Sequence, residues 1–386
     1  MSASNSQAFN HRLESLRGVA AMMVALGHAF LLLDAAAWPG VLRVCNGHAA
    51  VRLFFVLSGY VLSLALNRMN GPPSSALLTY AVRRFLRIYP AFAGATFLVA
   101  GATLLLPLGQ ANSAASVWFN QFYLKPVDTV ELRDNLLFHS ASLNCVTWTL
   151  RVEILGSLFL GVMHFLTRSW GWRGRAVLLA ALMGAARRFF DGDLVPYLFM
   201  FWLGYMLPAV APLVAKLEGG RRWMAPAMLL GAVAVFLRSQ QTRFELWGEP
   251  LGASMMLAWL LYGRPLAVYR LLDRGVVRFY GRISYSFYLL HFPVLYWAAL
   301  ALLRGLSPET LLWQPNVWAA GVGFGSVAIA TPLAWLLYVG VEKPGIALSK
   351  RLCDSLERAR KRERSIRPPE APVATPSTAV PLITGK

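Results

Sequence analysis

Two side chains that could do chemistry share one apolar stretch near the start of the chain. The stretch Ser15–Phe30, SLRGVAAMMVALGHAF, contains Arg17 and, eleven residues later, His28. An α-helix turns about 100° and rises about 1.5 Å per residue, so Arg17 and His28 lie on nearly the same face, roughly 16 Å apart. Burial in such a helix favours the neutral imidazole, which can take a proton. A histidine bonded only to neighbouring backbone is an equally open interpretation.

A second group of polar residues opens another apolar stretch, CVTWTLRVEILGSLF. Trp148, Arg151 and Glu153 fall within its first turns, and residues two apart on a helix face different directions. Arg151 and Glu153 therefore need separate partners. Glu153 could orient His28 or accept its proton. The alternative is that Glu153 forms a structural ion pair with an arginine on another helix.

Three arginines occur together in the stretch RRFLRIYP, Arg83 to Pro90. On a helix, Arg83, Arg84 and Arg87 place at least two guanidinium groups on adjoining faces, and guanidinium offers paired donors suited to phosphate. Anchoring to lipid headgroups is the alternative, and this stretch alone favours it.

Four further residues, in three motifs, are candidates. His291, in SYSFYLLHFPV, lines a cavity or holds helices together, and we favour the structural role. Glu342, in GVEKPG, is expected to offset an arginine cluster. Ser58 and Gly59, in FFVLSGYVLS, are small enough to let helices approach closely, which fits better than a nucleophilic serine because no base is adjacent in sequence.

The composition places these residues in a membrane protein. Of 386 residues, 57% are hydrophobic and 14% are charged, and the mean hydropathy is +0.50. The excess of basic residues lies between apolar stretches and forms no patch of the kind that binds nucleic acid, so we expect no nucleic-acid partner. The three cysteines lack metal-ligand spacing, and we expect no metal site.

Ten stretches are long enough to span a bilayer, which predicts an all-α bundle of about ten transmembrane helices. They are residues 13–34, 48–68, 88–109, 146–167, 174–190, 194–215, 223–238, 247–263, 279–303 and 316–340. With the N-terminus inside, the cytoplasmic connections carry three times as many Lys and Arg residues as the outer ones. The positive-inside rule therefore predicts that both termini are cytoplasmic.

Three predictions concern the connections and the tail. Residues 1–349 form one transmembrane domain, and residues 350–386 form a basic, then Pro-rich, largely disordered cytoplasmic tail. The outer connection, about residues 110–144, either lies on the bilayer surface or covers a site. Cys45 and Cys145 both fall on the outer side, where a disulfide could form.

The motifs together resemble the acyltransferase-3 family of integral-membrane acyltransferases. The matching stretches are RLESLRGVAAMMVALGH, FFVLSGY, RRFLRIYP, WTLRVE, SYSFYLLHFPV and VEKP, which occur in family order from residue 12 to residue 344. The resemblance implies that His28 is catalytic with Arg17 and Glu153, and that Arg83, Arg84 and Arg87 bind acyl-CoA. Trp148, Arg151, Ser58 and His291 are then candidates to line the cavity, and Arg151 to stabilise an oxyanion.

The implied reaction moves an acyl group, expected to be acetyl, from cytoplasmic acyl-CoA to a hydroxyl of a saccharide or polyketide glycoside. Acyl-CoA would be a co-substrate, with no bound cofactor, and the lipid bilayer would surround the protein. A proton-coupled transporter or flippase is the alternative, because buried His, Glu and Arg also form proton relays. Arg outnumbers Lys 31 to 6, which suggests a GC-rich bacterial genome and hence the bacterial inner membrane.

Overall fold

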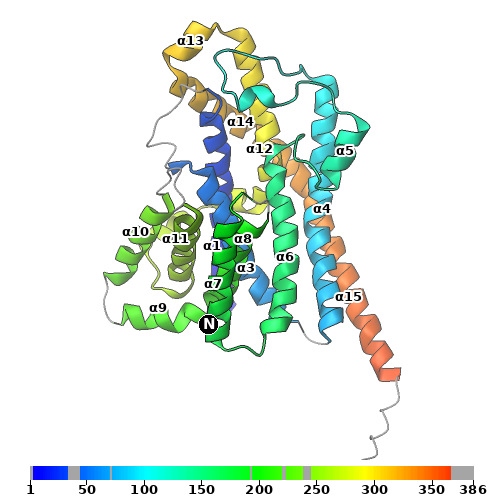
Figure 1. The fold of residues 1–386 in the computed structure, drawn as a ribbon, viewed down its shortest axis with the longest axis vertical. Helices are drawn as coiled ribbons and strands as arrows, with labels where there is room; N and C mark the ends of the chain where they lie inside the picture. The colour runs from blue at the N-terminus through cyan, green and yellow to red at the C-terminus, as the bar shows by residue number, and fades with distance from the viewer. Residues whose placement is uncertain are drawn as a thin grey trace, which may run out of the picture.

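The structure, a computed structural model, describes residues 3–33, 44–69, 72–191, 194–219, 223–237 and 245–366. These residues form helices and no strand (Figure 1). The α-helices are α1 (Ala3–Phe30), α3 (Gly47–Leu66), α4 (Pro73–Leu105), α5 (Thr129–Leu136), α6 (Trp148–Thr167), α7 (Trp172–Arg188), α8 (Val195–Met206), α9 (Ala211–Glu218), α10 (Met224–Leu237), α11 (Glu245–Tyr262), α12 (Gly275–Gly305), α13 (Pro308–Trp313), α14 (Pro315–Leu337) and α15 (Lys343–Ile366).

A helix occupies each of the ten predicted positions, although the bounds differ. Within the described part of the chain, six helical segments are long and apolar enough to cross a membrane. They are Gly47–Leu66, Pro73–Leu105, Cys145–Thr167, Val195–Glu218, Gly275–Gly305 and Pro315–Leu356. The protein is therefore a multi-pass, all-helical membrane protein, and the count of ten crossings stays a prediction.

The two ends of the described chain lie at the same end of the bundle. In Figure 1 the start of α1 and the end of α15 are both at the bottom, whereas α13 and the connection before α5 are at the top. An even number of crossings places the two ends in this way. Which of the two sides faces the cytoplasm stays a prediction from the loop charges.

Helices α1 and α12 cross with their backbones almost in contact. A side-chain carbon added to Gly18 would lie 2.5 Å from the backbone nitrogen of Gly281. Next to this crossing, Ser15 Oγ donates to the carbonyl of Leu272 over 2.6 Å. Arg12 donates two hydrogen bonds to Asp273 and thereby lowers the pKa of that carboxyl. The crossing fixes the register in which α1 and α12 present side chains further along.

Replacing Gly18 with alanine is expected to destabilise the protein by about 1–3 kcal/mol, because the added carbon forces the backbones of α1 and α12 apart. Gly101→Ala is the matched control, since a carbon added there meets nothing within 4 Å. Thermal unfolding of both purified variants in detergent measures the difference. Equal midpoints would contradict the close crossing.

The predicted close approach of helices is confirmed at Gly59. Gly59 in α3 and Gly204 in α8 form a second crossing, where an added carbon on Gly59 would lie 2.1 Å from the carbonyl oxygen of Phe201. The neighbouring side chain of Ser58 faces α6, where its hydroxyl donates to Glu153.

The end of the chain departs from the predicted domain boundary. Residues Tyr338–Glu342 form a π-helical turn that joins α14 to α15 without a break. Helix α15 packs along α4 and runs through to Ile366, so residues 350–366 are helical. The expectation of a largely disordered tail fails over this part, because Ser349 and Cys353 contact backbone carbonyls of α4. The Pro-rich residues 367–386 lie outside the described residues.

The connection between α4 and α6 folds over the end of α1. Ser116 binds the carbonyls of Leu31 and Leu32 through its hydroxyl and its backbone N–H, over 2.6 and 2.9 Å. The hydroxyl of Tyr296, on α12, donates to the carbonyl of Phe122 over 2.8 Å. The connection therefore covers the end of α1, in line with the second predicted arrangement, and its position relative to the bilayer stays a prediction.

The predicted disulfide is absent from the structure, since Cys45 and Cys145 are both free thiols. Cys45 lies against α1, where its carbonyl would be 2.5 Å from a carbon added to Gly27. Cys145 opens the short turn that leads into α6. Cys45 packs near α1 and Cys145 lies at the start of α6. The two thiols are therefore not paired, although both are predicted to lie on the same side of the membrane.

Candidate active site

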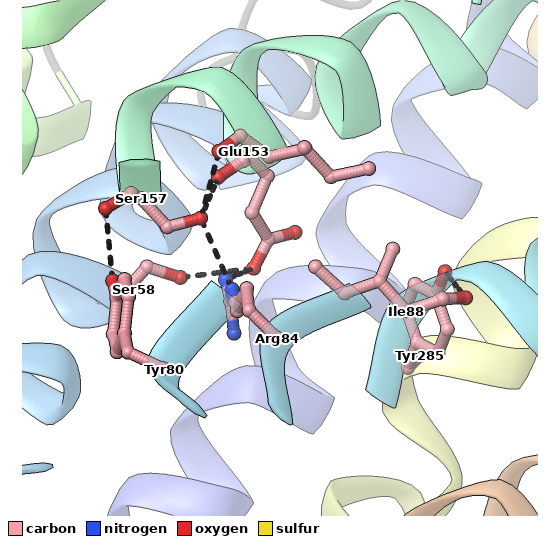
Figure 2. A network of polar contacts seen from close by, with 8 residues as sticks. Ser58, Tyr80, Arg84, Ile88, Glu153, Ser157 and Tyr285 are labelled. Carbon is pink, nitrogen blue, oxygen red and sulfur yellow. Dashed lines mark hydrogen bonds and ion pairs between the residues drawn. The ribbon is translucent and has the colours of Figure 1, made fainter. Parts of the chain in front are cut away.

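A polar site within the bundle is centred on Glu153 of α6. Its Oε1 accepts hydrogen bonds from the guanidinium of Arg84, on α4, and from Ser58 Oγ, on α3, the latter over 3.1 Å (Figure 2). Arg84 Nε also donates to Ser157 Oγ over 3.2 Å, and Tyr80 donates to the carbonyl of Ser157 over 2.9 Å. One carboxylate thus connects three helices.

This geometry selects between the two interpretations of Glu153. The carboxylate pairs with an arginine on another helix, which was the alternative left open, and the partners that the structure gives it do not include His28. The predicted direct contact between Glu153 and His28 is therefore not formed. Sequence spacing could not reveal this, because the register of α4 against α6 decides which arginine reaches Glu153.

A narrow cavity connects Glu153 to the middle of α12. It is lined by Arg17, Val51, Phe54, Phe55, Ser58, Thr149, Leu150, Glu153, Ser284, Tyr285 and Tyr288. Its volume, about 30 Å³, is enough for a water molecule, which needs roughly 10–15 Å³. Arg17 thus faces the same space as Glu153, and Phe54 and Tyr288 are in edge-on ring contact, with centroids 5.9 Å apart.

The side chains of the three arginines of α4 do not all point the same way. Helix α4 begins at Pro73, well before the predicted start of the span at residue 88, so all three lie within a continuous helix. Arg83 is directed towards α15, where its Nη2 lies 3.9 Å from Asp354 Oδ1. Arg84 pairs with Glu153. Arg87 is exposed, yet it lies among the charges of Arg17, Arg84, Glu153 and Glu342.

Glu342 lies at the end of the π-helical turn and is buried. Ser286 Oγ donates to its Oε2 over 2.6 Å, and the charges of Arg17 and Arg87 act on it. Its surroundings fit the prediction that Glu342 offsets an arginine cluster. Within the described part of the chain, no group of three His, Cys, Asp or Glu residues could hold a metal ion.

His28 and His291 form a pair at the far end of α1. The ring nitrogens His28 Nδ1 and His291 Nε2 are 3.1 Å apart, and the rings are nearly parallel, with centroids 5.3 Å apart. The ring of Trp118, from the connection between α4 and α6, has its centroid 5.4 Å from that of His28. His291 thus joins two helices, as we favoured, and it also contacts the candidate catalytic imidazole. Trp118 is one of the aromatic residues of the connection at about residues 110–144, but its contact with His28 was not predicted from the sequence.

Trp148 and Arg151 line a different space from the one predicted. They lie beside a hollow of about 420 Å³ at the start of α6, together with Phe138, His139, Ser140, Ala141, Thr147, Phe190, Asp191 and Tyr197. An adjoining hollow of about 650 Å³ shares Phe190 and Asp191. The first two turns of α6 therefore present Trp148 and Arg151 to this hollow, and Thr149 and Glu153 to the narrow cavity. This position separates Arg151 from the Glu153 site.

The helical bundle, with its inward-facing Arg, Glu and His side chains, defines an integral-membrane protein with a polar site inside the bilayer. A family model described as "Acyltransferase domain", that of the acyltransferase-3 family, matches residues 10–335. The chain belongs to this family and is a membrane acyltransferase. Neither the curated proteins nor the solved structures gave a match.

Proposed function

We propose that the protein transfers an acyl group, acetyl in the simplest case, from cytoplasmic acyl-CoA to a hydroxyl of a saccharide or of a glycosylated product. One observation carries the proposal. Helix α1 of this family member joins an arginine-rich region, around Arg17 and Arg87, to a histidine pair at its other end. The first region suits the phosphates of CoA, and the second suits the proton transfer that acyl transfer requires.

The donor would bind at the exposed end of the arginine region. Arg87 is the principal candidate for the CoA diphosphate, because it is exposed among mixed charges, whereas Arg84 is already paired with Glu153. Arg17 faces the narrow cavity beyond it. Arg83, directed at Asp354, would contribute at the rim. In the proposed location, the bacterial inner membrane, acyl-CoA would reach this end from the cytoplasm.

The thioester arm would extend along the cavity towards His28. At about 30 Å³ the cavity is too small for this arm, so Phe54 and Tyr288 must move apart when the donor binds. The acceptor hydroxyl transfers its proton to His28 as its oxygen attacks the thioester carbonyl. The C–S bond then breaks, and the CoA thiolate takes the proton from the imidazolium. The products are an ester and CoA.

The acceptor would bind in the hollow at the start of α6. Aromatic side chains and a few polar groups are the usual lining of a site for a small polar ligand. The hollow offers Trp148 and Tyr197, whose rings lie 5.4 Å apart, together with Arg151, His139 and Asp191. We assign Arg151 to acceptor binding, since it does not line the narrow cavity.

Trp148→Ala is expected to raise the KM for the acceptor about fivefold, because an aromatic contact surface of this kind contributes on the order of 1 kcal/mol. The affinity for acyl-CoA should not change, since Trp148 does not line the donor cavity. Initial rates at varied acceptor concentration measure the effect. Trp172→Ala is the control, because Trp172 is exposed at the start of α7 and lines neither space. An unchanged KM in the Trp148 variant would contradict acceptor binding in this hollow.

The experiment that tests the function compares cells with and without the gene by mass spectrometry of surface glycans and secreted metabolites. We expect one glycan or glycoside to lose the mass of an acyl group when the gene is deleted, and to regain it when the gene is restored. Identical acylation in both strains would contradict an acyltransferase acting on a glycosylated acceptor.

A further inference from the structure

We infer that His291 holds His28 in the tautomer that leaves Nε2 free to take a proton, which makes His291 a positioning residue for acyl transfer. The inference rests on the proposed role of His28 as the general base. It starts from two contacts of the His291 ring, one on each nitrogen.

The first contact fixes the tautomer of His291. Its Nδ1 lies 2.7 Å from the backbone carbonyl oxygen of Tyr288. A carbonyl oxygen can only accept a hydrogen bond, so Nδ1 of His291 carries a proton. In a neutral imidazole one nitrogen donates and the other accepts. Nε2 of His291 is therefore an acceptor.

The second contact carries this constraint to His28. His28 Nδ1 is 3.1 Å from His291 Nε2. Since that nitrogen of His291 accepts, His28 Nδ1 must carry the proton and donate. The other nitrogen of His28, Nε2, then has a free lone pair, and no described residue donates a hydrogen bond to it. The tautomer with the proton on Nδ1 thus results from the chain Tyr288, His291 and His28.

The same contact persists during the reaction. When His28 Nε2 takes the proton of the acceptor hydroxyl, its Nδ1 still donates to His291, and a hydrogen bond from a charged donor is stronger than one between neutral groups. His291 would therefore stabilise the imidazolium as it forms. A carboxylate in this position would do so more strongly, but burying a second charge inside the membrane costs about 2.5–3.5 kcal/mol or more.

The location of His291 supports this role. It is 2% exposed, and its ring packs against His28 and Phe287. Tyr288, whose carbonyl fixes the tautomer, also lines the narrow cavity through its side chain. Its hydroxyl is within 3.0 Å of Thr149 Oγ1, on α6. Movement of α12 in this region would thus reach the cavity and the histidine pair together.

Two substitutions separate this role from simple packing. In His291→Gln, the amide oxygen occupies roughly the place of Nε2 and can accept the hydrogen bond from His28. In His291→Asn, the shorter amide occupies the place of Nδ1 and retains the bond to the Tyr288 carbonyl, but His28 loses its acceptor. We expect kcat to fall about 10- to 100-fold in His291→Asn, by analogy with the loss when outer hydrogen-bond partners of metal-binding histidines are removed. His291→Gln should stay within a few-fold of the wild type, and the KM for acyl-CoA should not change in either variant.

The test combines these rates with ¹⁵N NMR of histidine-labelled protein in lipid nanodiscs. In the wild type and in His291→Gln, we expect His28 to show a protonated Nδ1 and an unprotonated Nε2. In His291→Asn the signals should shift towards the opposite tautomer. A wild-type spectrum with the proton on His28 Nε2, or equal kcat values for the two variants, would overturn the inference. Because the spectrum is recorded without substrates, it tests the tautomer even where the proposed function fails.

Discussion

Replacement of His28 with alanine is expected to reduce acyl transfer by roughly 10²- to 10⁴-fold, the usual contribution of a general base. The affinity for CoA should change little, because Arg17 and His28 are separated by roughly 16 Å along α1. The effect should therefore appear in kcat. Release of the CoA thiol from acetyl-CoA, measured in membranes that contain the acceptor, gives the rate, and calorimetry with CoA gives the affinity.

The control for this substitution is His164→Gln. His164 is also buried and hydrogen-bonded, since its Nδ1 lies 2.9 Å from the hydroxyl of Tyr205, but it lines neither the cavity nor the hollow. It should keep wild-type turnover. If His28→Ala kept wild-type turnover as well, His28 would not be the base.

The second large effect is expected at the ion pair between Arg84 and Glu153. Arg84→Met leaves the carboxylate with the neutral Ser58 hydroxyl as its remaining direct donor. Removing one partner of a fully buried ion pair costs about 3–5 kcal/mol, and this pair, whose side chains are 10% and 22% exposed, should approach the lower end of that range. Glu153→Gln should cost less, because the amide oxygen can still accept from Arg84 and Ser58. The double variant should be more stable than the sum of the two single effects predicts, since it leaves no unpaired charge.

Arg83→Met is the matched control for Arg84→Met. Arg83 precedes Arg84 on the same helix, but its side chain is 44% exposed and lies 3.9 Å from Asp354. Such surface pairs contribute about 0–1 kcal/mol. Thermal unfolding of the purified variants in detergent gives the comparison. Equal losses at the two positions, or additive losses in the double variant, would show that the pair does not link α4 to α6.

The sequence predicted the helices well, because membrane-spanning helices must be apolar over most of their length and the connections carry the charges. The predicted start of α4, at residue 88, is too late. The turns that contain Arg83 and Arg84 are polar, and polarity is typical of a connection between spans. Those turns are helical since α15 and α6 pack against them. The helical part of the tail was missed for the same reason, as its partner, α4, is distant in sequence.

The sequence identifies the candidate residues one by one, but it does not show which residues they contact. Arg17, His28 and Glu153 stand out because charged and titratable residues are rare within membrane helices. That His28 contacts His291, and Glu153 contacts Arg84, depends on how pairs of helices cross. The α1–α12 crossing is set by Gly18 and Gly281, residues 263 positions apart in the chain. Helical periodicity in the sequence does not reveal contacts between residues so far apart in the chain.

The most direct test is a structure of the protein in lipid nanodiscs with a CoA analogue in which a ketone replaces the thioester. We expect the diphosphate to contact Arg87, the arm to separate Phe54 from Tyr288, and the carbonyl carbon to lie next to Nε2 of His28. An analogue bound with its carbonyl away from His28, while the narrow cavity stays closed, would contradict it.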